Sequence, residues 1–136
     1  MVFLLCASSC KKTEPQVVTY LESFEQIDFE ECQVVFVLPN YACAFCTKAT
    51  FTWLEHFSET EAPWVITDND LYEGFYKVII EKDQDRMVQY NPYVNAAFVV
   101  TVKKGELISI ESIGLQELKM LPEIYTKVNK GCSLDQ

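Results

Sequence analysis

The 136-residue chain has no apolar run approaching the roughly 20 residues of a membrane-spanning helix. It is also poor in bases: eleven Lys and Arg stand against twenty Asp and Glu, which gives a net charge of −9. Nucleic-acid surfaces need clustered Lys and Arg, so we expect no nucleic-acid partner. We find no internal repeat and no low-complexity segment. The length fits a single domain, and a hydrophobic content of 49% is enough for a core.

Histidine occurs only once, at His56. A structural zinc site needs about four ligands, and the chain has neither a second Cys-x-x-Cys pair nor a pair of histidines. We therefore expect no metal site of that kind. A copper(I) site built from two thiolates needs fewer ligands and stays open as an alternative. The six cysteines are Cys6, Cys10, Cys32, Cys43, Cys46 and Cys132.

Residues 33–57 contain a pair of cysteines between a predicted strand and a predicted helix. Val34–Leu38 is an apolar run typical of a buried strand, and Pro39-Asn40 ends it. Cys43-Ala44-Phe45-Cys46 follows, and then apolar residues recur at helical spacing. This order places two thiols at a helix N-terminus, where unpaired N–H groups and the helix dipole stabilise a thiolate. We expect Cys43 to be the exposed nucleophile and Cys46 to be the buried resolving thiol, on one stripe with Ala49 and Trp53.

The remaining elements are predicted from periodicity and turn residues. Residues 16–25 favour a short helix, although Val17–Tyr20 also reads as an edge strand. After the motif helix we expect a strand over 64–67, a helix over 71–82, a loop over 83–95 with an extended piece at 87–90, a strand over 96–102, a turn at 103–105, an antiparallel strand over 106–110, and a helix over 115–129 ended by Gly131. Pro122 either kinks this last helix or marks its start.

The first twelve residues, MVFLLCASSCKK, resemble the end of a bacterial lipoprotein signal peptide. An apolar run, small residues and a cysteine follow one another in the right order. The resemblance implies that Cys10 is lipidated, and that the protein is anchored to a membrane of the bacterial cell envelope and faces the periplasm. A short hydrophobic tail is the alternative. We divide the chain into a signal-like tail (1–12), an acidic segment (13–32) and a domain (33–132).

The order of elements across residues 33–130 resembles that of the thioredoxin fold. Two markers carry the likeness: Cys43-x-x-Cys46 between strand and helix, and the hairpin over 98–108. The resemblance implies an α/β three-layer sandwich, with a central mixed sheet of about four strands flanked by helices. The chain departs from the family at three places. Ala42 replaces a tryptophan, Ala44-Phe45 replaces Gly-Pro, and Asn95 or Ala96 stands where the family has a cis-proline.

With the lipoprotein-like start, the closest group is the membrane-anchored thioredoxin-like proteins of the cell envelope. This resemblance implies thiol–disulfide exchange with protein thiols or disulfides, through a redox partner protein and without an organic cofactor. The alternative is a non-catalytic lipoprotein that binds a partner or copper(I) and keeps Cys43–Cys46 as a structural disulfide. In such a fold Cys32 and Cys132 lie at the pole opposite the motif, where they form either a structural disulfide or two free thiols.

Overall fold

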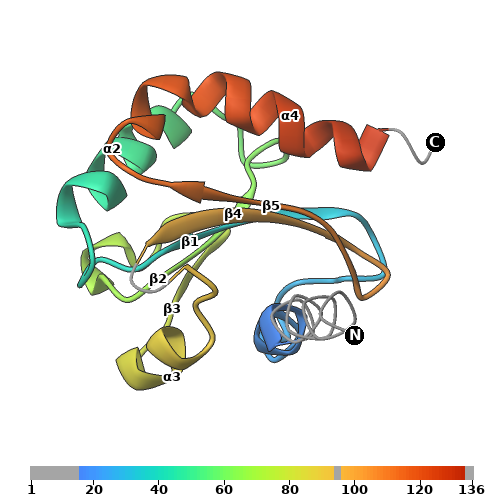
Figure 1. The fold of residues 1–136 in the computed structure, drawn as a ribbon, viewed down its shortest axis with the longest axis horizontal. Coiled ribbons are helices and arrows are strands. Elements are labelled where there is room, and N and C mark those ends of the chain that lie inside the picture. The colour runs from blue at the N-terminus through green and yellow to red at the C-terminus, as the bar shows by residue number, and fades with distance from the viewer. Residues whose placement is uncertain (1–15, 94–95, 134–136) are drawn as a thin grey trace, which may run out of the picture.

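The computed structural model describes residues 16–93 and 96–133, and its centre is one mixed β-sheet. The strands lie in the order β3-β2-β1-β4-β5 (Figure 1). They are β1 (Gln33–Leu38), β2 (Trp64–Thr67), β3 (Val78–Ile80), β4 (Ala97–Lys103) and β5 (Glu106–Ile113). β1 pairs parallel with β2 and antiparallel with β4; β2–β3 is parallel and β4–β5 antiparallel. The sheet therefore has five strands, one more than the four expected.

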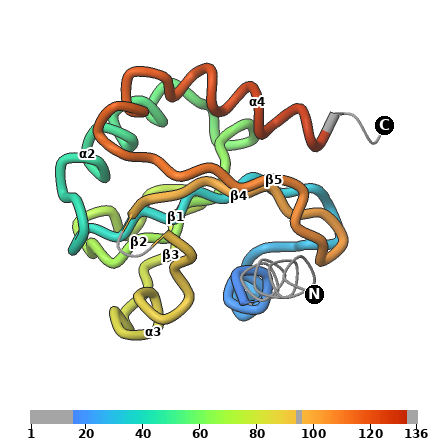
Figure 2. Tube along the Cα trace, in the orientation of Figure 1, coloured from blue at the N-terminus to red at the C-terminus, as the bar shows by residue number. Residues whose placement is uncertain are grey.

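Helices cover both faces of this sheet and make a three-layer arrangement. Helices α2 (Ala44–Leu54) and α4 (Leu121–Ser133) lie on one face, while helical residues 16–22 and α3 (Gln84–Gln89) lie on the other (Figures 1 and 2). Each face has its own core. Val35 and Val37 of β1 join the core on the α3 side, and Phe36 and Leu38 join the core on the α2 side. A strand buried on both faces reads as a continuous apolar run, which is the pattern seen in the sequence.

The expected boundary at residue 33 is not a boundary of the structure. Six apolar residues of the acidic segment belong to the core on the α3 side: Val17, Tyr20, Leu21, Phe24, Ile27 and Phe29. The segment reads as acidic because its charged residues alternate with these buried ones along a short helix and the turns after it. The helix over 16–25 is found, but it ends at residue 22. The described domain thus begins before β1.

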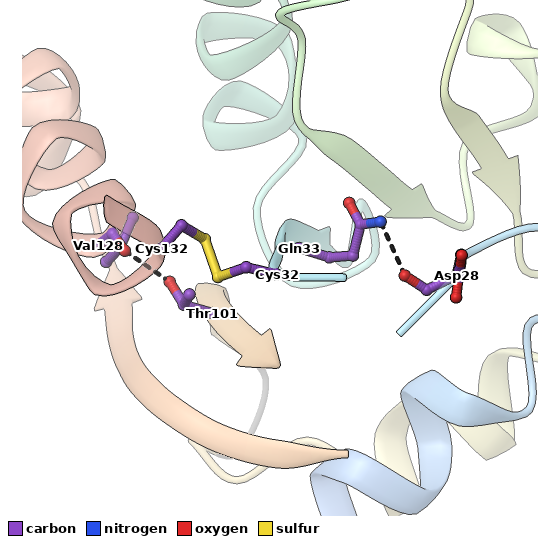
Figure 3. The surroundings of a disulfide bond; sticks show 6 residues. All are labelled: Asp28, Cys32, Gln33, Thr101, Val128 and Cys132. Atoms are coloured by element: carbon purple, nitrogen blue, oxygen red, sulfur yellow. Dashed lines mark hydrogen bonds between the residues drawn. A yellow bond between two sulfur atoms is a disulfide. The ribbon is translucent and has the colours of Figure 1, made fainter. Parts of the chain in front are cut away.

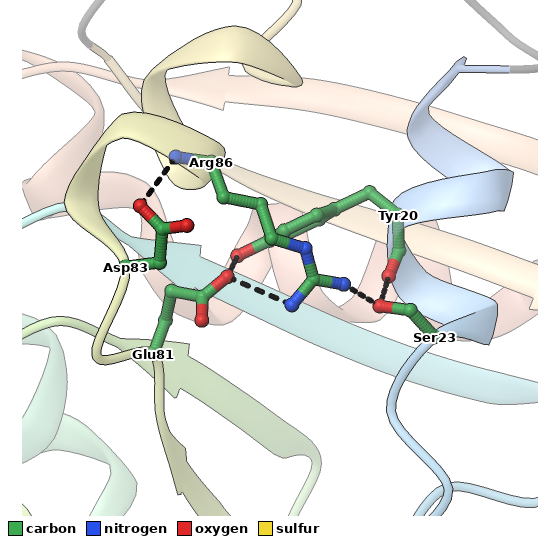
Figure 4. Close-up of polar contacts among 5 residues, drawn as sticks. All are labelled: Tyr20, Ser23, Glu81, Asp83 and Arg86. Carbon is green, nitrogen blue, oxygen red and sulfur yellow. Dashed lines mark hydrogen bonds and ion pairs between the residues drawn. The ribbon is translucent and has the colours of Figure 1, made fainter.

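A partly buried polar network also ties this segment to the domain (Figure 4). The Tyr20 hydroxyl donates to Glu81 Oε1 at 2.9 Å, and Arg86 Nη1 donates to the same oxygen at 3.2 Å. The Arg86 guanidinium also bonds the Ser23 hydroxyl and stacks over the Tyr20 ring. Glu81 is buried, so its charge needs these partners.

The helix expected over 71–82 is wrong. The chain makes a short 3-10 turn, η1 (Asp70–Tyr72), and then β3. Lys77 and Gly74 both adopt positive φ, which an α-helix does not allow. Leu71, the first residue of the expected apolar stripe, is 82% exposed. The stripe therefore came from residues that do not share a face, and β3 supplies the fifth strand.

The loop expected over 83–95 contains α3, and the extended piece at 87–90 is wrong. The Asp83 side chain caps α3 by accepting from Arg86 N at 3.2 Å, and Met87 buries itself in the core. Among the described residues, no helix has the length and apolar character to cross a membrane.

The β4–β5 hairpin turns at Lys104-Gly105, as the sequence predicted. Both residues have positive φ, +52° and +75°, as a type I′ turn requires. The last helix is preceded by η2 (Glu117–Met120), and α4 begins at Leu121. Pro122 marks this start, because a proline is tolerated in a first helical turn. Gly131 does not end α4, which continues to Ser133.

Candidate functional site

Cys43 and Cys46 form a disulfide at the N-terminus of α2, with their Cα atoms 5.2 Å apart. Cys43 is the N-cap residue, and its backbone is extended. Its Sγ accepts a hydrogen bond from Cys46 N at 3.0 Å. The sulfur thus takes up one of the N–H groups that a helix start leaves without an intrahelical partner. The same N–H would stabilise negative charge on Cys43 once the disulfide is reduced.

The two cysteines differ in accessibility. Cys43 is partly exposed, whereas Cys46 is only 3% exposed. Cys46 belongs to the buried side of α2, whose other members are Thr47, Thr50, Phe51 and Leu54. Ala49 and Trp53, expected on this stripe, are half-buried and flank it. An incoming sulfur therefore reaches Cys43 and not Cys46.

The loop between β1 and Cys43 is held by the loop that follows β2. Asp68 Oδ1 accepts from Asn40 N at 2.6 Å, and Asn69 Nδ2 donates to Asn40 Oδ1 at 3.1 Å. Pro39 O accepts from Ala42 N and Cys43 N, at 3.2 and 3.4 Å. Because β1 and β2 are parallel, both loops lie at the same end of the sheet. These bonds fix where α2 begins, and with it the position of the disulfide.

Aromatic side chains fill the other face of this end of the sheet. Tyr41, Tyr90 and Tyr93 pack against the core on the α3 side. The Tyr41 hydroxyl is buried and has no hydrogen-bond partner of good geometry. Burial raises the pKa of Tyr41, the nearby Asn91 amide lowers it, and the charge of Asp68 raises it. These tyrosines pack the loops around the site.

Asn91 closes the loop that precedes β4. Its Nδ2 donates to Ala96 O at 2.9 Å, and its Oδ1 accepts from Tyr93 N at 2.9 Å. The thioredoxin resemblance noted in the sequence places that family's cis-proline in this segment. Asn95, one of the two residues expected at that place, lies outside the described residues.

Two threonines of α2 are buried beside Cys46 in the helix sequence, and neither was identified from the sequence alone. Thr47 Oγ1 donates to Cys43 O at 3.3 Å. Thr50 Oγ1 is fully buried and has no hydrogen-bond partner. Thr50 lies four residues after Cys46, so both side chains share one face of α2. The available signal was the spacing of Thr47 and Thr50, which lie one and four residues after Cys46 and so fall on the same side of the predicted helix.

A second disulfide joins Cys32 to Cys132 at the opposite end of β1, with Cα atoms 5.4 Å apart (Figure 3). The pairing considered from the sequence is thus present. Next to it, Thr101 Oγ1 donates to Val128 O at 2.8 Å and holds α4 on β4. Figure 3 also shows Gln33 Nε2 bonded to Asp28 O, at 2.8 Å. These contacts fix the start of β1 and the end of α4.

An apolar groove of about 160 Å³ runs between α2 and the edge strand β3. Phe51 and Leu54 of α2 line one side, and Val78, Phe75 and Tyr76 line the other. It contains no cysteine. In the part of the chain that the structure describes, no three His, Cys, Asp or Glu side chains come together as a metal site. Cys10, the expected lipidation site, lies outside the described residues.

Comparison with family models, with curated proteins and with solved structures yields no match to this chain.

Proposed function

We propose that this chain is a thioredoxin-like oxidoreductase that exchanges electrons with protein thiols or disulfides through Cys43 and Cys46. One observation carries the proposal: a disulfide at the start of α2 with one partly exposed and one buried cysteine. A purely structural disulfide does not need this asymmetry. Thiol–disulfide exchange does need it, because one sulfur must be accessible to form the mixed disulfide with the partner, and the other resolves that mixed disulfide afterwards.

The arrangement of the sheet supports the proposal. A β1-α2-β2 unit, joined by the antiparallel β4–β5 hairpin and then α4, is compatible with a thioredoxin-like sandwich. In this reading β3 is an additional edge strand. The dithiol lies at the carboxyl end of β1, where open α/β sheets commonly place their sites.

The proposed reaction balances without a cofactor. In the reduced protein, the Cys43 thiolate attacks one sulfur of a partner disulfide, and the other partner sulfur leaves as a thiolate. The Cys46 thiolate then attacks Cys43 Sγ. The Cys43–Cys46 bond forms, the mixed disulfide breaks, and the partner leaves with two thiols after taking protons from water. Two electrons pass to the partner, and the reverse steps oxidise a partner dithiol.

The place proposed for this chemistry is the bacterial cell envelope. The support is the N-terminal sequence alone, in which Cys10 follows an apolar run and small residues. A lipid on Cys10 would hold the domain at a membrane, facing the periplasm. That compartment keeps disulfides, of which the described domain contains two.

Equilibration with glutathione redox buffers tests the function. The protein is incubated across a range of ratios of reduced to oxidised glutathione, quenched in acid, alkylated and mapped by mass spectrometry. We expect Cys43–Cys46 to titrate reversibly while Cys32–Cys132 stays oxidised. A Cys43–Cys46 bond that stays oxidised at every ratio would instead support the rival, a binding module with a structural disulfide. Reduction of insulin disulfides by the reduced protein is the matching activity measurement.

A further inference from the structure

The Thr50 hydroxyl is an unexplained polar group on the buried side of α2. Thr50 is 0% exposed, and its Oγ1 has no hydrogen-bond partner. A threonine inside a helix commonly donates to the carbonyl four residues earlier, which here is Cys46 O. Thr52 on the exposed side of α2 does this, with its Oγ1 2.9 Å from Lys48 O. Thr50 does not, so its hydroxyl remains free at the cost of a buried unpaired donor.

Cys46 lies four residues before Thr50 on the buried side of α2. Residues four apart on a helix have Cβ atoms about 5–6 Å apart, which a hydroxyl and a sulfur can span. In the disulfide, Cys46 Sγ is bonded to Cys43 Sγ and carries no charge. A thiolate is a far better hydrogen-bond acceptor. Reduction followed by loss of the Cys46 proton would therefore supply the partner that Thr50 lacks.

We propose that Thr50 is a positioning residue for the resolving thiol, and that its hydroxyl donates a hydrogen bond to Cys46 Sγ once the disulfide is reduced. The inference rests on the proposed function. In the oxidised protein the hydroxyl is unpaired; in the reduced protein it is paired. Thr50 thus favours reduction of the Cys43–Cys46 bond and keeps a buried Cys46 able to ionise.

Thr47, the other buried threonine of α2, makes a different contact. Thr47 Oγ1 already bonds Cys43 O while the disulfide is intact, so it has no spare donor for Cys46. Of the two buried threonines of α2, only Thr50 has a hydrogen bond to gain. The redox dependence is therefore specific to position 50.

The test is a redox titration of Thr50→Val, which keeps the shape of the side chain and removes the hydroxyl. We expect the equilibrium constant for reduction of Cys43–Cys46 by glutathione to fall about tenfold, which corresponds to a potential about 30 mV lower. Thr50→Ser keeps a hydroxyl and should restore the wild-type equilibrium. Ser109→Ala is the matched control, since Ser109 Oγ on β5 is also buried and unpaired but is remote in sequence from the cysteines. It should leave the equilibrium unchanged.

A second readout separates positioning from a general loss of structure. In a Cys43→Ser background, the ultraviolet absorbance of the Cys46 thiolate is followed against pH, which needs no reagent to reach the buried sulfur. Adding Thr50→Val should move the midpoint of this profile upward by about one pH unit, because the thiolate loses its donor. Thr50→Ser should leave the midpoint in place. Thermal unfolding of each oxidised variant checks that the domain folds.

The outcomes are distinct. If wild-type Cys43–Cys46 never exchanges with glutathione, both the proposed function and this inference are overturned. If the wild type exchanges but Thr50→Val changes neither the equilibrium nor the midpoint of Cys46 ionisation, only the role of Thr50 is overturned. A fall in the equilibrium that Thr50→Ser does not restore would also overturn it, since packing and not the hydroxyl would then be the cause.

Discussion

Gly131 of α4 lies so close to Ile108 of β5 that a Cβ on Gly131 would come within 2.7 Å of Ile108 Cγ2. Real Cβ atoms do not approach other atoms so closely, so only glycine allows α4 to pack at this depth. The next residue is Cys132. The close approach therefore brings the end of α4 down to where Cys132 meets Cys32.

Gly131→Ala should destabilise the oxidised domain by about 1–3 kcal/mol, the usual cost of overpacking. Urea unfolding measures the change. Ile108→Ala removes the clashing methyl, so in that background Gly131→Ala should cost much less and can become stabilising, since alanine favours a helix by about 1 kcal/mol. An equal cost in both backgrounds would show that the contact with Ile108 is not the cause.

The Cys32–Cys132 disulfide should contribute strongly to stability, because it closes a loop with a sequence separation of 100. In the chain-entropy model, loops of this length are stabilised by about 4–5 kcal/mol. The double variant Cys32→Ala/Cys132→Ala should lower the free energy of unfolding by about that much. Non-reducing peptide mapping of the wild type should recover the two cysteine peptides linked. Recovery of both as alkylated free thiols would contradict the pairing.

Cys46→Ser should trap a mixed disulfide between Cys43 and a partner, because the resolving thiol is gone. Non-reducing electrophoresis detects the adduct, and reduction of the isolated adduct should release the partner. Cys43→Ser is the matched control and should trap nothing, since Cys46 is buried. Adducts that form through Cys46 instead would reverse the assignment of the two roles.

Alkaline pH should destabilise the domain through Tyr20. Burial raises the pKa of Tyr20, and the charge of Glu81 and the hydrogen bond to it raise the pKa further. Above pH about 10 the unfolded chain releases this proton while the folded chain keeps it, so stability should fall by about 1.4 kcal/mol per pH unit. Denaturant unfolding between pH 8 and about 11 measures the slope.

In Tyr20→Phe the alkaline slope should be smaller, although buried Glu81 loses a donor at neutral pH at a cost of about 1–3 kcal/mol. Part of the slope should remain, because burial also raises the pKa of Tyr125. Tyr76→Phe, which alters an exposed tyrosine, serves as the control. An unchanged slope in Tyr20→Phe would remove Tyr20 as its source.

Membrane anchoring should depend on Cys10. When the chain is expressed in bacteria with a complete signal peptide, Cys10→Ala should move it from the membrane fraction to the soluble fraction. Cys6→Ala, a change at the nearby cysteine, should leave it at the membrane. If Cys10→Ala stays in the membrane fraction, the lipid anchor is ruled out.

Local signals in the sequence identified the elements around the site. The apolar run of β1, the paired positive-φ residues of the β4–β5 turn and the helix after Cys43 each depend on residues close in the chain. The positions of Cys43 and Cys46 followed from the same stretch. The meeting of Cys32 and Cys132 needed a fold in addition, because 100 residues separate them.

What the sequence could not provide depends on tertiary contacts. Val78 and Ile79 fit a helical stripe with Leu71 and Phe75, and only the pairing of β3 with β2 makes them a strand. Helix α3 buries a single residue, Met87, so it has no periodic stripe to detect. The free hydroxyl of Thr50 is likewise a property of how α2 packs, and composition carries no sign of it.

The Cys32–Cys132 bond encloses all five strands and nearly all of α4 in a single covalent ring. One backbone cut anywhere in that ring opens it without releasing a fragment. Tension between the segments on either side of the bond would pass directly across the 5.4 Å between the two Cα atoms. The disulfide, and not the residues between the two cysteines, would carry the force. The sheet and the dithiol at its far end would therefore stay intact while the chain is pulled.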